Sequence, residues 1–141
     1  MVHAGNVTVR GALAASDALI SGNLTGKHAE SLSLFGSTVG GNLVADHTTG
    51  GPNHLCNSTI GGSVIVRESS SSSFWGIGYV CDSGPLTVGL NLTFQNNKGG
   101  GYISGNTIGG DLDCQKNTPA PTNPGSDNLV GGNEKGQCAG F

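Results

Sequence analysis

The chain has 141 residues, of which 26 are glycine, and only 11 % are charged and 5 % aromatic. Its net charge of −3 argues against a nucleic-acid-binding surface, which needs a basic patch. No apolar run has the length of a membrane span, and no signal peptide is visible, so we expect that any export signal has been removed.

A six-residue motif of the form Thr-aliphatic-Gly-Gly-Asn-Leu recurs along the chain. Clear copies occupy residues 38–43, 59–64, 87–92 and 107–112, weaker copies occupy 19–24 and 129–134, and a decayed copy opens the chain at 5–7. The Asn position falls at residues 6, 23, 42, 63, 91, 111 and 133, so the steps are 17, 19, 21, 28, 20 and 22 residues. A motif that returns about every twenty residues is typical of a stacked repeat architecture.

Each repeat is expected to form about three short strands. Alternation such as Leu92-Thr93-Phe94-Gln95 indicates a strand with one buried face. One repeat cannot bury its own apolar side, so the turns must stack. We therefore predict an all-β, single-stranded parallel β-solenoid of about seven short turns, forming one domain over residues 1–141. The absence of a strict hexapeptide period favours a right-handed β-helix, and 12–19 is the only helix candidate.

Stacking predicts vertical rows of equivalent side chains. The expected core ladder consists of Val39, Leu43, Ile60, Val64, Val88, Leu92, Ile108 and Leu112. An Asn ladder is expected along one corner at Asn23, Asn42, Asn91 and Asn133, because stacked Asn side chains can hydrogen-bond from one turn to the next. Threonines 38, 59, 87 and 107 should form a further row.

The step from residue 63 to 91 is about eight residues longer than its neighbours. We place the excess in a loop insertion at residues 67–78, which carries Phe74 and Trp75. These aromatic side chains either fold back over the solenoid or form an exposed contact patch for a partner or a sugar ring.

Four cysteines lie at positions 56, 81, 114 and 138. Cys56 and Cys81 occupy comparable places in neighbouring repeats, so we expect Cys56–Cys81 and Cys114–Cys138 disulfides and an oxidising, extracytoplasmic setting. Four free thiols in a cytosolic protein are the alternative. A proline-rich loop is expected at residues 115–128, followed by a C-terminal cap at 129–141 that the second disulfide would hold.

Few residues indicate chemistry. Asp111 and Asp113 are the closest carboxylate pair, and a solvated ladder position explains Asp111 better than acid–base catalysis. A loop metal site of Asp46, His47 and His54 is conceivable, but surface histidines without a ligand are far commoner. We expect no catalytic residues, no metal and no cofactor.

The segments GNVTV, GSTVGGNLVAD, NSTIGGSVIV, GNTIGGDLDC, NTPAP and GGNEKGQC resemble the glycine/asparagine-rich β-solenoid repeats of secreted bacterial proteins. That resemblance implies a β-helix outside the cytoplasm and no catalytic residues. There is a looser similarity to bactofilins, whose small β-helices polymerise end to end. The chain differs from bactofilins in its cysteines and its insertion.

The functional expectation is a non-enzymatic, extracellular or cell-surface structural protein. Its first turn exposes an apolar strand edge, so we expect self-assembly, as a homo-oligomer or a filament through the solenoid ends. The alternative is a glycan- or surface-binding module that uses the loop with Phe74 and Trp75 and the Thr ladders. We expect no nucleic-acid partner and no membrane span.

Overall fold

The computed structural model describes residues 3–51, 53–70, 73–76 and 84–141, with the backbone alone for 73–76. The described chain is an all-β parallel solenoid with no helix. Its strands form three sheets, A, B and C, and every pairing between successive turns is parallel. Sheets A and B each contain seven strands, so the chain makes about six complete turns.

Sheet A is a narrow face of two-residue strands. Its members are β1 (His3–Ala4), β4 (Leu19–Ile20), β7 (Thr38–Val39), β10 (Thr59–Ile60), β13 (Thr87–Val88), β16 (Thr107–Ile108) and β18 (Leu129–Val130). Sheet B is one of the two broad faces. Its members are β2 (Val7–Val9), β5 (Leu24–Lys27), β8 (Leu43–Asp46), β11 (Val64–Arg67), β14 (Leu92–Gln95), β17 (Leu112–Gln115) and β19 (Glu134–Gly136).

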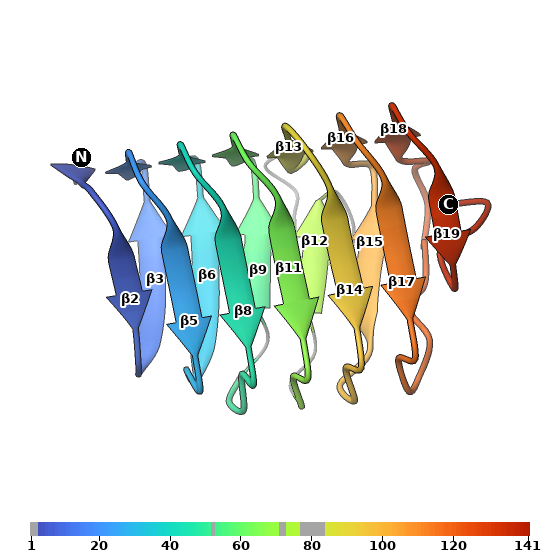
Figure 1. The fold of residues 1–141 in the computed structure, drawn as a ribbon, viewed down its shortest axis with the longest axis horizontal. Coiled ribbons are helices and arrows are strands. Elements are labelled where there is room, and N and C mark those ends of the chain that lie inside the picture. Colours follow the sequence, from blue (N-terminus) through green and yellow to red (C-terminus); the bar gives the residue numbers. More distant parts are fainter. Residues whose placement is uncertain (1–2, 52, 71–72, 77–83) are drawn as a thin grey trace.

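Sheet C is the other broad face. Its members are β3 (Ala12–Ser16), β6 (Ser31–Phe35), β9 (Asn53–Cys56), β12 (Ser73–Gly76) and β15 (Gly101–Ser104). In Figure 1 the strands of sheet B run downwards in front, those of sheet C run upwards behind, and the chain advances from left to right. The coil is therefore right-handed, as the missing hexapeptide period indicated.

The core lies between the three sheets and is built from vertical rows of aliphatic side chains. Val39, Ile60, Val88 and Ile108 are in register in sheet A, and Leu43, Val64, Leu92 and Leu112 are in register in sheet B. All eight are at most 1 % exposed, so the predicted core ladder is confirmed. Each turn buries its apolar side only because its neighbours cover it.

Two segments remain to be placed. Residues 12–16 belong to the short helix candidate of a chain in which no segment indicated a good helix, and they form β3, because their backbone pairs with β6. The insertion is also not a loop at 67–78: Arg67 ends β11, and residues 73–76 form β12, between β9 and β15. Ten residues separate β12 from β13, whereas two separate β9 from β10 and β15 from β16, so the extra length follows the strand.

Candidate functional site

The N-terminal end of the solenoid has open strand edges. In the described part of the chain, β1, β2 and β3 each pair on one side only, with β4, β5 and β6. An unpaired strand edge presents backbone N–H and C=O groups that can bind a further strand. This end therefore has the hydrogen-bonding groups of an interface.

The side chains of the same end form an apolar floor. Val7, Leu13 and Ala15 pack against the core but are only partly buried, whereas their in-register neighbours in the next turn are at most 1 % exposed. They line a hollow of about 240 Å³ together with alanines, Ile20 and a single serine. Exposed apolar surface of this kind is typical of interaction sites.

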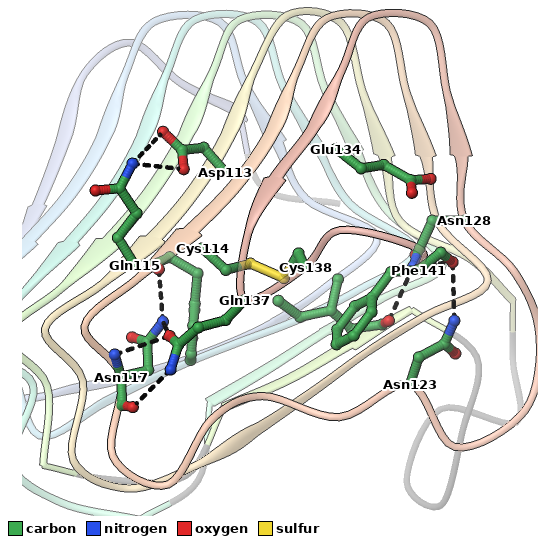
Figure 2. The surroundings of a disulfide bond; sticks show 12 residues. Asp113, Cys114, Gln115, Asn117, Asn123, Asn128, Glu134, Gln137, Cys138 and Phe141 are labelled. Carbon is green, nitrogen blue, oxygen red and sulfur yellow. Dashed lines mark hydrogen bonds between the residues drawn. A yellow bond between two sulfur atoms is a disulfide. The ribbon is translucent and has the colours of Figure 1, made fainter.

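The C-terminal end is closed by a disulfide bond. Cys114 in β17 is bonded to Cys138, which follows β19, with a Cα–Cα distance of 5.3 Å. Both cysteines are fully buried. Figure 2 shows the bond lying beneath the final residues of the chain, with Phe141 beside it. The Cys114–Cys138 prediction is confirmed, and the bond holds the last residues against the core.

Hydrogen bonds complete this cap. The backbone carbonyl of Phe141 accepts bonds from the Asn128 N–H and from the Asn123 side chain, both at 2.8 Å (Figure 2). The Glu134 carboxylate accepts a bond from the Gly140 N–H at 2.9 Å. Thr122, in the proline-rich stretch, bridges to Tyr102 at the edge of sheet C. Residues 122–128 thus pair along the edge of sheet C, and residues 137–141 pack over the last turn, while β18 and β19 pair on one side only.

Charged side chains also distinguish the C-terminal end. Glu134 occupies the row in which Leu112 lies one turn earlier. Lys135 binds Asp111 at 2.7 Å. The hydrogen bond from Lys135, together with one from the Asn133 N–H, lowers the pKa of Asp111, and Asp111 in turn raises the pKa of Lys135. The two ends therefore differ in chemistry: β1–β3 are open above apolar side chains, whereas the last turn is partly covered and carries charged side chains, with Leu129 exposed in β18.

Comparison with known proteins gives no relative on which to base a function. No protein-family model, curated protein or solved structure matches the chain. The functional argument therefore depends on the geometry of the molecule itself.

The predicted Asn ladder is present, and its hydrogen bonds from turn to turn are accepted by the side-chain oxygens. Except at the last turn, Oδ1 of each Asn accepts a hydrogen bond from the backbone N–H at the same position of the next turn; Asn23 Oδ1, for example, accepts the Asn42 N–H at 2.8 Å. Ser63 and Asp111 continue the row. Asn133, the last member, donates its N–H to Asp111.

Two further polar ladders, mostly buried, were not predicted. One corner carries Ser37, Ser58, Asn106 and Asn128, and the other carries Thr48, Ser69, Asn97, Asn117 and Gln137. In both rows a side-chain oxygen accepts the backbone N–H of the turn before it. A signal was present, since residues 48, 69, 97 and 117 are 21, 28 and 20 apart, like the Asn positions.

The other predicted residues have mixed outcomes. Cys56 is disulfide-bonded, but its expected partner Cys81 lies outside the described residues. The backbone of Phe74 and Trp75 belongs to β12, in register with Tyr102 and Ile103, and their side chains also lie outside the description. Whether they form a contact patch stays a prediction.

The Thr row and the suggested metal loop can be located. Threonines 38, 59, 87 and 107 are in register on sheet A and half-buried or exposed, so the row exists, while binding by it stays a prediction. Asp46 and His47 are in contact. His54 is not part of their cluster and lies in β9, with its ring 6.1 Å from that of Phe35.

Proposed function

We propose that this protein is a structural β-solenoid subunit that works outside the cytoplasm and associates with a second copy through its N-terminal end. The observation that carries the proposal is the difference between the ends. Strands β1–β3 leave their outer edges open above an apolar floor. At the last turn the open edges are those of β18 and β19, and a disulfide-held segment packs over the core beside them. Solenoids generally need such ends covered.

Contact between two N-terminal ends fits these surfaces best. A twofold arrangement would set apolar floor against apolar floor and would bring open strand edges together, as in an isologous interface. A head-to-tail filament, with β19 stacked on β2, would instead set Glu134 against Val7, because these residues end the same inward row of sheet B. Burying charged groups against apolar side chains costs free energy unless they find partners. The filament is therefore the less favoured form of assembly.

The location is supported by the cysteines. Cys114–Cys138 is a disulfide, and disulfides persist mainly in oxidising compartments. In the described part of the chain no helix is long and apolar enough to cross a membrane. A rigid, disulfide-held rod is suited to a surface or matrix role.

A structural role rather than a catalytic one is supported by the state of the carboxylates. Asp46 is bound by Arg67 and His47, Asp111 by Lys135, and Asp113 by Gln115. These acids already serve as acceptors for neighbouring side chains of the solenoid wall.

Analytical ultracentrifugation over a range of concentrations tests the proposal. The wild-type protein should form dimers, and Leu13→Lys should shift it to monomers by placing a charge in the N-terminal floor. Leu129→Lys is the matched control, because Leu129 lies in the terminal strand of sheet A at the other end and is 70 % exposed. Circular dichroism should show that both variants keep the β-fold.

A wild-type protein that stays monomeric at every concentration would overturn self-association. Dissociation of the assembly by Leu129→Lys but not by Leu13→Lys would overturn the choice of end.

A further inference from the structure

One corner of the solenoid places three potential metal ligands one above another. His28, His47 and Glu68 follow strands β5, β8 and β11 and have positive φ angles of 57°, 56° and 53°. Because the backbone conformation repeats and parallel strands are about 4.8 Å apart, their side chains leave the corner in the same direction. The His28 and His47 rings lie 4.9 Å apart.

His47 has a carboxylate oxygen at each of its ring nitrogens. Asp46 Oδ1 lies 2.5 Å from Nδ1, and Glu68 Oε2 lies 2.6 Å from Nε2. A neutral imidazole has one N–H and cannot donate to both. The arrangement therefore suits either a doubly protonated ring or a ring that donates through Nδ1 and binds a cation through Nε2.

Asp46 is built to hold the ring rather than to bind an ion itself. Its side chain is only 10 % exposed and its other oxygen, Oδ2, accepts a hydrogen bond from Arg67 at 3.0 Å. A carboxylate that fixes the Nδ1–H of a histidine, leaving Nε2 for the metal, is the usual support for a metal-binding histidine. Asp46 is thus a positioning residue.

Glu68 offers a second donor atom for such an ion. Its side chain is 48 % exposed, so it can move the short distance needed for an ion to replace the hydrogen between Oε2 and Nε2. Two metal–ligand bonds of about 2.0–2.2 Å at a tetrahedral angle place the nitrogen and oxygen about 3.4 Å apart, so the Glu68 carboxylate would have to move by about 0.8 Å. The donor atoms of Asp46, His47 and Glu68 all lie within 4.8 Å of one another.

Solvent reaches the same place. A hollow of about 480 Å³ lies over this corner, and its lining includes His28, Thr49, Asn96 and Lys98 along with both ligands. Waters can complete the coordination of an ion here, and the His28 imidazole is close enough to approach. Lys98 is the one cation in that lining and opposes metal binding.

We propose that His47 Nε2 and Glu68 bind a divalent transition-metal ion of the Zn²⁺ class at this corner. A nitrogen-plus-carboxylate donor set favours Zn²⁺ or Cu²⁺ over Mg²⁺ and Ca²⁺, which prefer all-oxygen sites. Binding releases a proton where the ring was doubly protonated. The site bridges two turns, so the ion would also clamp β8 to β11.

Isothermal titration of the metal-free full-length protein with Zn²⁺ tests the proposal, with Mg²⁺ as the comparison ion. Wild type should bind one Zn²⁺ per chain and no Mg²⁺. His47→Gln and Glu68→Gln should each weaken Zn²⁺ binding by about tenfold or more, and Asp46→Asn by about tenfold through loss of ring positioning. His3→Gln and Glu30→Gln are matched controls at exposed positions and should change the Kd less than about twofold.

The ¹⁵N chemical shifts of the histidine rings give a second measurement, and they would not change with Zn²⁺ if the cluster only stabilised the fold. Zn²⁺ should shift Nε2 of His47 and leave Nδ1 attached to its proton. Absence of saturable binding at millimolar Zn²⁺, or binding that His47→Gln leaves unchanged, would overturn the proposal. In that case the cluster is a charged hydrogen-bond network only.

Discussion

Asn42 Oδ1 accepts a hydrogen bond from the backbone N–H of Ser63, 2.8 Å away and one turn further along the coil. The second glycine of this motif copy makes this possible, because a Cβ on Gly62 would lie 2.3 Å from that same oxygen. The Asn of one turn and the Gly of the next therefore act together: the Gly leaves room for the Asn side chain, and the Asn oxygen joins successive turns at the corner between sheets A and B.

Replacing Asn42 by alanine should destabilise the protein modestly. The substitution removes one acceptor at an exposed corner, where water replaces it, so we expect a loss of about 1 kcal/mol in the free energy of unfolding. Urea denaturation measures the change. Asn42→Asp is the control, because it keeps an acceptor oxygen at the same place, as Asp111 does naturally. An equal loss in both variants would show that the oxygen is not what matters.

The buried ladder should be more sensitive than the exposed one. Asn106 is 1 % exposed, its Oδ1 accepts the Leu86 N–H, and its Nδ2 donates to Asn128. Asn106→Ala leaves buried groups without these partners, which we expect to cost about 2–3 kcal/mol. The same urea experiment measures it. A loss no larger than that of Asn42→Ala would contradict the role given to the buried corner.

The first position of the Gly pair must be glycine because the backbone of the neighbouring turn approaches it closely. A Cβ on Gly61 would lie 2.6 Å from the carbonyl oxygen of Gly40 in the turn below. Gly61→Ala should therefore force the two turns apart and lower the free energy of unfolding by about 2–3 kcal/mol. Gly11→Ala is the control, since no atom lies within 4 Å of the corresponding position. Thermal denaturation of both variants should show a clear fall in Tm for Gly61→Ala alone.

Acid should weaken the corner held by Asp46. Burial alone raises the pKa of Asp46, but hydrogen bonds from Arg67 and His47 outweigh it, so this pKa lies below its ordinary value. A carboxyl with a lowered folded-state pKa adds stability above its unfolded pKa of about 4 and loses it as the pH falls through the folded value.

The difference in unfolding free energy between wild type and Asp46→Asn, measured with a chelator present, should therefore shrink below about pH 4. His47 binds Asp46 through Nδ1 and Glu68 through Nε2. Glu68→Gln should therefore be measured in parallel, so that the pH dependence due to Glu68 can be subtracted. A difference that stays constant with pH would mean that the carboxylate is not stabilised by these partners.

The rows of the core could be predicted because burial in a solenoid depends on a repeated local pattern. Val39 and Leu43 lie at fixed offsets from the Gly pair. Because side chains alternate between the two faces of a strand, the offset alone predicts which ones point inward. The strand β12 was missed for the opposite reason. A run of serines before Phe74 has the composition of a loop, whereas the strand conformation of residues 73–76 is imposed by β9 and β15 on either side.

The cluster at His47 shows what spacing could have revealed. Sequence analysis grouped His47 with His54, seven residues away, whereas the structure places it against Glu68, which is 21 residues away. The steps from His28 to His47 and from His47 to Glu68, 19 and 21 residues, match the steps of the Asn ladder. Residues one repeat apart are neighbours in this fold, and near neighbours in the sequence are often not.

The asymmetry of the ends could be predicted only in part. The uncovered first turn and the Cys114–Cys138 cap follow from the sequence. The motif copy at 129–134 already aligns Glu134 with Leu112, and the structure adds that this row faces the core and ends at the last turn.

Backbone hydrogen exchange at low and high protein concentration tests the proposed association most directly. If two copies join at their N-terminal ends, the amides of β2 and β3 should exchange more slowly at high concentration, while those of β19 should not change. Unchanged exchange throughout would contradict self-association. Slowing at β19 to the same extent as at β2 and β3 would contradict the choice of end and favour a head-to-tail filament.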